Sequence, residues 1–294
     1  MDLSIALNQC LSGLTRAGIL FMLASGLTLI FGVARVINFA HGSLYMLAVY
    51  LSYTFLRLFG PGGVGFWLSL GAVAASLALI GGALETGLIR RVYGRDPLQQ
   101  LLLTFALVYI IGDVVKFVWG ITPKSVSRPP FLEGGIPVPG GSFPVYNVFV
   151  IALAAAVGAG LWLMLARSRL GWLIRAVAAD IEITDALGVN VPRLLTLVFM
   201  LGGLLVGVGG AAAAPLTAGA LGMDVEIVIL CFIVVIIGGA GSLLGAAVAA
   251  LLVGLLESFG ILLLPQFAVV FIYALMAGVM IVRPWGLFGV PGRS

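Results

Sequence analysis

Charged side chains are scarce in this chain. Only 9% of its 294 residues are charged, whereas 62% are hydrophobic, and there is a single histidine. A soluble protein of this composition could not bury its apolar residues and still present a polar surface. The shortage of charge therefore excludes a soluble globular domain. It predicts an all-α, polytopic transmembrane helical bundle, because a spanning helix needs about 20 mostly apolar residues.

Cysteines and catalytic motifs are also rare. The two cysteines, Cys10 and Cys231, stand far apart and form no CxxC pair, which argues against a disulfide framework or a thiolate metal site. The patterns GxxxxGK[ST], HExxH and GxSxG are missing, so the chain has no recognisable means of hydrolysing ATP or of acting as an enzyme. The basic residues form no patch with interleaved aromatics, which excludes nucleic acid as a partner. We expect no cofactor and no metal.

Long apolar runs dominate what is present. We expect eight to ten segments, some of them discontinuous helices, and place nine, at 9–31, 40–58, 64–84, 98–119, 145–166, 193–215, 225–241, 243–263 and 266–283. The glycines of LGGLLVGVGG (201–210) predict a close approach of neighbouring helices. Those of IGGAGSLLGA (237–246) predict a break or a tight turn.

The basic residues are unevenly divided between the two sides. If all nine segments cross, one side receives Arg35, Arg90, Arg91, Arg95, Arg167, Arg169, Arg175, Arg193, Arg283 and Arg293. The positive-inside rule makes this side cytoplasmic, together with the C-terminus and the 167–193 segment, and places the N-terminus outside. A re-entrant segment would reverse only the N-terminus.

The inner 167–193 segment has the pattern of an amphipathic helix. Its apolar stripe consists of Leu170, Ile174, Val177 and Ile181. Gly188 follows as a helix-ending residue. The polar face carries Arg175, Asp180, Glu182 and Asp185. A helix lying on the membrane would favour lysine and arginine there. The acidic face favours docking of a soluble partner, and packing on the chain's own helix ends is the alternative.

The chain's only histidine lies in RVINFAHGSLYML (35–47), between two apolar runs. A helical RVINFAH would place Arg35, Asn38 and His41 on one face, whereas an unwound one would also expose backbone groups. Polar groups at membrane depth are costly unless they line water or pair internally. Two interpretations follow: an interfacial loop, or a discontinuous helix beside a path across the membrane. Without a second histidine or a cysteine cluster, His41 does not indicate a metal site.

Few ionisable residues remain inside the apolar segments. Asp113 and Lys116 are three apart and can pair on one helix face. Glu257 has no local partner, so it lies near the interface, pairs across helices or faces a pathway. We expect Arg16 to extend toward the membrane interface if the first span begins nearer Leu14. An ion-coupled carrier would need more buried acidic residues than these. The energy source should therefore lie on another polypeptide.

Four stretches resemble one known family. They are SGLTLIFGVARVINFAHGSLYML near the start, RAVAADIEITDALGVNVPR in the inner segment, GGAGSLLGA in the third quarter and RPWGLFG at 283–289. Together they are similar to the LivH-type permeases of bacterial branched-chain amino acid ABC importers, over nearly the whole chain.

The resemblance implies a single transmembrane permease domain over 1–294, with a cytoplasmic coupling segment at 167–193 and a periplasmic loop at 120–144. It implies four kinds of partner: a second permease, LivM-like or identical, two cytoplasmic ATPase subunits that bind the ATP, a periplasmic substrate-binding protein, and membrane lipid. The location it implies is the bacterial inner (plasma) membrane, as a multi-pass protein.

It also implies roles for individual residues. The coupling segments of such permeases have the form EAAxxxG, and Glu182 and Gly188 keep this spacing, with Ile183 and Thr184 in place of the alanines. The residues expected to couple to an ATPase are Arg175, Asp180, Glu182, Asp185 and Gly188.

The resemblance determines the substrate less closely than it determines the fold and the partners. The substrate would be a branched-chain or other apolar amino acid, whose zwitterionic head needs hydrogen-bond partners. Our candidates to supply them are Asn38, His41, Gly42 and Ser43. One alternative is an importer of urea or short-chain amides. Another is an ion-coupled secondary transporter that uses Asp113 and Glu257.

Overall fold

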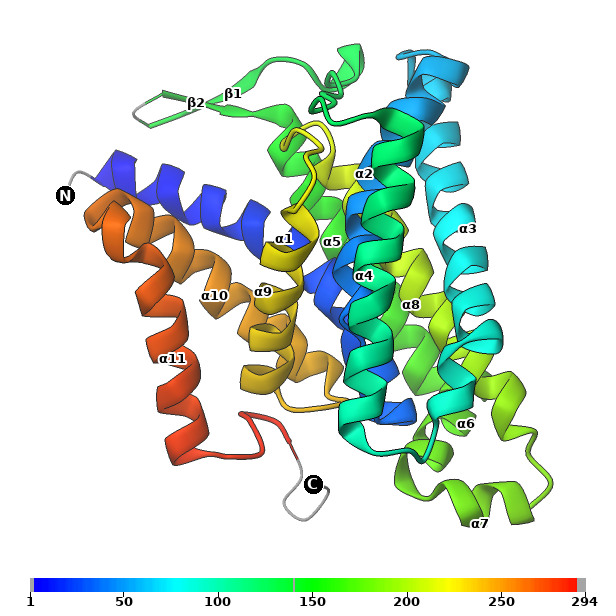
Figure 1. Cartoon of the computed structure of the whole chain (residues 1–294). Helices are drawn as coiled ribbons and strands as arrows, with labels where there is room; N and C mark the ends of the chain where they lie inside the picture. The colour runs from blue at the N-terminus through cyan, green and yellow to red at the C-terminus, as the bar shows by residue number, and fades with distance from the viewer. Residues whose placement is uncertain (1–2, 140, 290–294) are drawn as a thin grey trace.

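The computed structural model describes residues 3–139 and 141–289, and its regular structure is almost entirely helical (Figure 1). The long helices are α1 (Leu3–Ala34), α2 (Ala40–Phe59), α3 (Gly63–Gly87), α4 (Pro97–Trp119), α5 (Val145–Arg167), α8 (Val191–Ala213), α9 (Met223–Gly238), α10 (Leu243–Leu263) and α11 (Ala268–Val282). The shorter elements are α6 (Arg169–Ala179), α7 (Ile181–Ala186), the 3-10 turns η1 (Ile89–Val92), η2 (Pro130–Leu132) and η3 (Pro265–Phe267), and the strands β1 (Gly135–Val138) and β2 (Gly141–Pro144).

The structure confirms the predicted helical membrane bundle. Within the described residues, seven helices are long and apolar enough to cross a membrane. The elements α2 and α9 fall outside this group, α9 because it has only 16 residues.

Figure 1 shows the start of α1 and the β1–β2 hairpin at one end of the bundle, and α6 and α7 at the opposite end. This is the arrangement expected if all nine segments traverse the bundle. Arg293, one of the arginines assigned to the cytoplasmic side, lies outside the described residues.

Helix α1 forms the centre of the bundle. Its 32 residues make a helix of about 48 Å, longer than the ~30 Å hydrocarbon core of a bilayer. It therefore runs obliquely (Figure 1) and contacts α5, α8, α9 and α10.

Arg16 forms an ion pair with Glu257, so of the alternatives for Glu257 the pairing across helices is the one observed. The Nε atom of Arg16 donates a hydrogen bond of 2.9 Å to Oε2 of Glu257 on α10. The oblique course of α1 brings these side chains together, and an ion pair costs less at this depth than two separate charges.

Glycines set the distance between α3 and α8. A side chain at Gly203 would collide with the backbone carbonyl of Leu77, and a Cβ at Gly81 would lie 2.7 Å from the carbonyl oxygen of Phe199. The two backbones can approach this closely only because these positions lack a Cβ. The packing predicted from 201–210 is thereby confirmed.

The predicted break after α9 is also confirmed. Gly239 and Gly241 have φ angles of 97° and 77°, in the left-handed region that favours glycine. The Ser242 side chain accepts a hydrogen bond of 3.0 Å from the Gly245 N–H and so begins α10. The segment after α11 then closes the end of α9, because the Leu287 N–H donates to the carbonyl of Ile237 at 2.8 Å.

The outer connection contains regular structure that the sequence analysis did not predict. The strands β1 and β2 pair antiparallel, with Gly135 opposite Pro144, and Phe143 is buried. Its buried ring explains why a proline- and glycine-rich stretch holds one conformation. Earlier in this connection, Lys124 forms a two-bond backbone bridge with Gly219, which precedes α9, at N···O distances of 2.9 and 2.8 Å.

Candidate functional site

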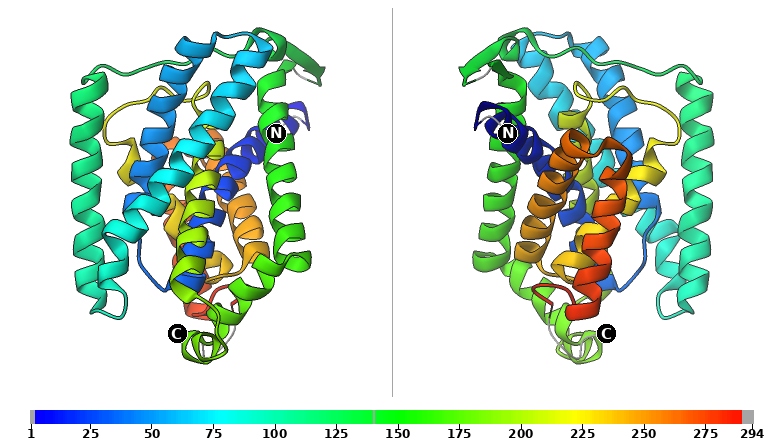
Figure 2. Two further views of the ribbon diagram at one scale, coloured as in Figure 1. Left: turned by 90° about the vertical axis from the view of Figure 1, so that its right-hand side faces the viewer. Right: turned by 90° about the vertical axis from the view of Figure 1, so that its left-hand side faces the viewer.

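The chain is unwound between α1 and α2. Residues 35–38 are not helical, and Arg35 has a φ of 52°, the only positive φ of a non-glycine residue in the described part of the chain. In Figure 2 this connection rises from the lower end of α1 to the start of α2, which lies part-way up the bundle. The first part of RVINFAH is thus unwound, whereas Ala40 and His41 already belong to α2.

Asn38 and His41 are buried at this break. Their exposed fractions are 2% and 1%. The Nε2 atom of His41 lies 2.9 Å from the carbonyl oxygen of Leu23 on α1, so we assign it as the donor. Within the described residues, Nδ1 of His41 and Oδ1 of Asn38 have no hydrogen-bond partner. The break therefore holds spare hydrogen-bonding capacity inside the bundle.

Gly42 and Ser43 meet the first turn of α9. A side chain at Gly42 would collide with the carbonyl oxygen of Asp224, so the two helices begin against each other. The Ser43 hydroxyl donates a hydrogen bond of 2.9 Å to Oδ2 of Asp224. Asp224 is 5% exposed, and the sequence analysis missed it. The available signal was an acidic residue in the turn directly before the 225–241 apolar run.

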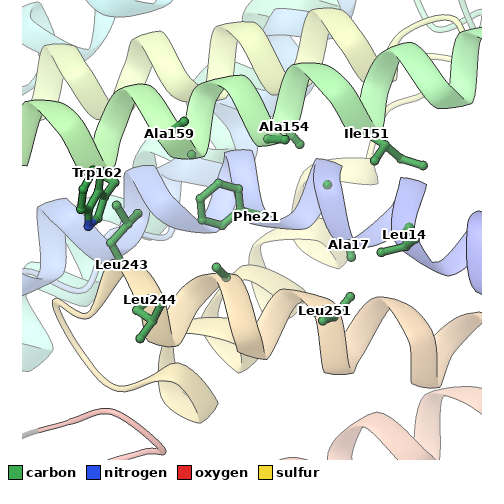
Figure 3. Close-up of a pocket in the computed structure, with 14 residues that line it drawn as sticks. Leu14, Ala17, Phe21, Ile151, Ala154, Ala159, Trp162, Leu243, Leu244 and Leu251 are labelled. Atoms are coloured by element: carbon green, nitrogen blue, oxygen red, sulfur yellow. The ribbon is translucent and has the colours of Figure 1, made fainter.

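A separate groove, away from the break, is apolar. It has a volume of about 500 Å³ and is lined by residues of α1, α5 and α10. Figure 3 shows Phe21 of α1 between the side chains of α5 and α10, with Trp162 and Leu243 at one end. No titratable side chain lines this groove. It therefore offers no partner for the charged head of an amino acid.

The inner segment forms two helices instead of the single one predicted. Asp180 ends α6 in an extended conformation, with a φ of −154°, and its side chain accepts a hydrogen bond of 2.9 Å from the Ile183 N–H to begin α7. Aspartate competes for backbone donors in this way and favours caps over helix interiors. The predicted stripe is consequently correct at Ile174 and Val177, which are buried, and wrong at Ile181, which is 39% exposed.

The end of α7 confirms the predicted role of Gly188 as a helix stop. Its φ is 83°. Its N–H donates to the carbonyl of Asp185 at 2.9 Å, and the Val189 N–H donates to that of Thr184 at 3.4 Å. Glu182 and Asp185 are exposed.

Arg175 contacts residues of its own helix and of the end of α5. It donates to the carbonyl of Leu165 at the end of α5, and its guanidinium lies 5.7 Å from the centre of the Trp172 ring. Because α6 also contacts α1, α5 and α8, the segment is attached to the bundle through α6.

Comparison with known sequences decides the family. The family described as "Branched-chain amino acid transport system / permease component" matches residues 9–280. The chain belongs to this family. The permease is 29% identical to the high-affinity branched-chain amino acid transport permease BraD of Pseudomonas aeruginosa, over 97% of this chain and 96% of BraD. It is 26% identical to LivH of Escherichia coli, over the same shares.

A more distant similarity joins the permease to the ribose import permease RbsC of Escherichia coli, at 26% identity over 65% of this chain and 60% of RbsC. No solved structure matches. The family assignment confirms that the chain is the permease component of a branched-chain amino acid ABC transport system, a multi-pass subunit of the inner membrane without a catalytic domain. In such systems ATP binds to the partner ATPases.

The Asp113–Lys116 pair expected on α4 of the permease is not formed. Across residues 3–139 and 141–289, the ion pairs are Arg16–Glu257 and Arg90–Glu85 only. Both Asp113 and Lys116 are exposed on α4. A spacing of three permits contact on a helix but does not require it.

A buried ionic cluster at the inner end of the permease was also missed. Glu85 of α3 is fully buried and accepts two hydrogen bonds from Arg90, at 3.0 and 2.8 Å. It also accepts one from Tyr93 at 3.1 Å and one from Thr196 of α8 at 2.8 Å. Burial, together with the charge of Glu85, raises the pKa of the Tyr93 hydroxyl, which therefore stays protonated and donating. The cluster attaches α3 to the start of α8, directly after the inner segment.

Proposed function

We propose that this permease moves branched-chain amino acids inward by alternating access, driven by two ATPase subunits that dock on α6 and α7. The named substrates of BraD and LivH support the substrate class. In this proposal residues 1–294 form one permease domain.

The observation that carries the proposal is the exposed surface of α7. Ile183 and Leu187 are 61% and 79% exposed, beside the acidic Glu182 and Asp185. An apolar patch rimmed by charge is typical of a surface that binds another protein. The adjoining α6 contacts α1, whose inner end leads into the unwound break. A displacement of α7 by a docked ATPase can therefore be transmitted to the break through the packed helices α6 and α1.

In this proposal a second permease covers the face of α4 that points away from the bundle. Asp113 and Lys116 project from a helix that is long and apolar enough to span the membrane. Charged side chains facing lipid are costly, so this face requires protein or water. A copy of this chain or a LivM-like partner would cover it. The periplasmic loop at 120–144, with its hairpin, would receive the substrate-binding protein.

The break supplies the substrate path in this proposal. An aliphatic side chain loses little on leaving water, whereas the zwitterionic head needs hydrogen bonds throughout. Asn38, His41 and Ser43 would supply them, and Gly42 permits the close contact with α9 that brings Asp224 to the same place.

Introducing charge into the apolar patch of α7 tests the docking. We expect the double variant Ile183→Glu, Leu187→Glu to lower both co-purification of the ATPases and uptake by at least about tenfold, because central apolar contacts of an interface are each worth about 2 kcal/mol. The measurement is ATPase recovery on the tagged permease, with leucine uptake in the same cells. Ile121→Glu is the matched control, since Ile121 is equally exposed, at 69%, but in the outer connection. It should retain the ATPases.

The runner-up, an ion-coupled secondary carrier, makes the opposite prediction. The permease alone, in liposomes with an ion gradient, would then transport. Its required coupling residue Glu257 is already paired with Arg16. Transport by the isolated chain, or full uptake by the α7 double variant, would refute the ATP-driven proposal.

A further inference from the structure

A second, smaller pocket lies where α2, α4 and α9 meet. Its volume is about 210 Å³. It is lined by Phe39, Phe105, Val108, Asp224, Val225, Val228 and Ile229. The rings of Phe39 and Phe105 meet edge to face, with their centres 6.1 Å apart. The surface of the lining is almost wholly apolar, as suits an aliphatic side chain, and Asp224 is its one ionisable residue.

Asp224 is a buried carboxylate that lacks a cation. It is 5% exposed, and Ser43 is the only side chain in the described part of the chain that donates to it. Neither ion pair found among the described residues involves it. Buried carboxylates are normally paired, and an ionisable group inside a membrane bundle marks a functional site. The missing positive charge can come from a ligand.

The start of α2 lies beside this carboxylate. Phe39, which precedes α2, provides no side-chain acceptor for the first N–H groups of that helix, and the N–H groups of His41 and Gly42 make only long hydrogen bonds, of 3.4 and 3.3 Å, to the carbonyls of Asn38 and Phe39. Backbone N–H groups at a helix start favour an anion. Asn38 is buried just before α2, and its unpartnered Oδ1 is an acceptor that suits an ammonium group. This small region thus offers a partner for each part of an α-amino acid. Asp224 matches the cationic end, the start of α2 matches the anionic end, and the apolar lining matches the aliphatic body.

We propose that this pocket is the permease's own binding site for an aliphatic α-amino acid in transit. Asp224 binds the α-ammonium group, the start of α2 faces the α-carboxylate, and the Phe39, Phe105 and Val108 side of the pocket encloses the branched side chain. Selection for an apolar amino acid is therefore made a second time inside the membrane, after the external binding protein. This inference rests on the proposed function and adds the site and its specificity.

The role of the Asp224 carboxylate is tested with the variant Asp224→Asn. The complete transporter is reconstituted with its second permease, ATPases and binding protein. We expect leucine uptake to fall by at least about 30-fold, since removing one partner of a buried charge pair costs about 2 kcal/mol or more. Glu226→Gln is the matched control, because it removes the same charge from an exposed position in the same turn of α9. It should transport like the wild type.

The pocket is tested with Val108→Phe, which reduces its volume from the α4 side. We expect leucine and isoleucine uptake to fall about tenfold or more relative to alanine, because bulky side chains no longer fit. Should Asp224→Asn fail to assemble, this ratio decides the proposal on its own.

The outcomes separate the two proposals. An inactive wild-type transporter of verified composition would refute the proposed function. An active wild type with Asp224→Asn equal to Glu226→Gln, or with an unchanged leucine-to-alanine ratio in Val108→Phe, would overturn only the pocket. Wild-type uptake that needs a proton or sodium gradient, with that need abolished by Asp224→Asn, would assign Asp224 to an ion and also overturn it.

Discussion

Replacing Gly203 by leucine should prevent the permease from folding into a stable bundle. The new Cβ would collide with the backbone carbonyl of Leu77, so α3 and α8 would have to separate. Overpacking commonly costs 1–3 kcal/mol, and here backbone must move, so we expect a loss of at least about 3 kcal/mol. The measurement is the thermal unfolding midpoint of the detergent-purified protein, together with the yield of monodisperse material.

Gly71→Leu is the matched control for this prediction. Gly71 lies on α3, like Leu77, but has open space where its side chain would be. Leucine is the better helix former by nearly 1 kcal/mol, so this variant should be as stable as the wild type or more stable. Equal behaviour of the two variants would show that the α3–α8 contact is not as close as described.

Replacing Glu85 by alanine should be the second most damaging change. It leaves Arg90, Tyr93 and Thr196 without their shared acceptor. Breaking a buried ion pair from one side costs about 3–5 kcal/mol, and we expect the lower end, about 3 kcal/mol, because the Arg90 side chain is 36% exposed and can turn to water. Unfolding of the purified variant by heat measures the loss.

Two further variants make this result specific. Glu133→Ala removes an exposed carboxylate from the outer connection and should leave stability within about 0.5 kcal/mol. Glu85→Gln keeps the size and part of the hydrogen bonding, and should fall between alanine and the wild type. A Glu85→Ala protein as stable as Glu133→Ala would contradict the structural role of the cluster.

Local features of the fold were predictable because local sequence determines them. The segment predicted at 243–263 coincides with α10 (Leu243–Leu263), since Ser242 caps its start and Pro265 follows its end. The helix stop at Gly188 was readable for the same reason. The division of 170–187 into α6 and α7 was not predicted, although Asp180 carries the signal, because the apolar spacing alone continues across it.

The site was predictable only in part. The unusual polarity of Asn38 and His41 was visible in the sequence, and both proved to be buried. Asp224 could not be connected to them, because its partner Ser43 lies 181 residues away in the chain. Glu85 and Thr196 are likewise 111 residues apart. Periodicity predicts which face of a helix is apolar but does not predict which helices become neighbours.

The bridge between Lys124 and Gly219 joins the connection after α4 to the segment that leads into α9. Gly219 stands shortly before Asp224, so two backbone hydrogen bonds and a few covalent links separate the outer connection from the buried carboxylate. A protein that pressed on the hairpin side of this connection could not shift Lys124 without also pulling on the residues that lead into α9. The arrival of a substrate at this connection and the movement of α9 that makes room for it would then be one and the same motion.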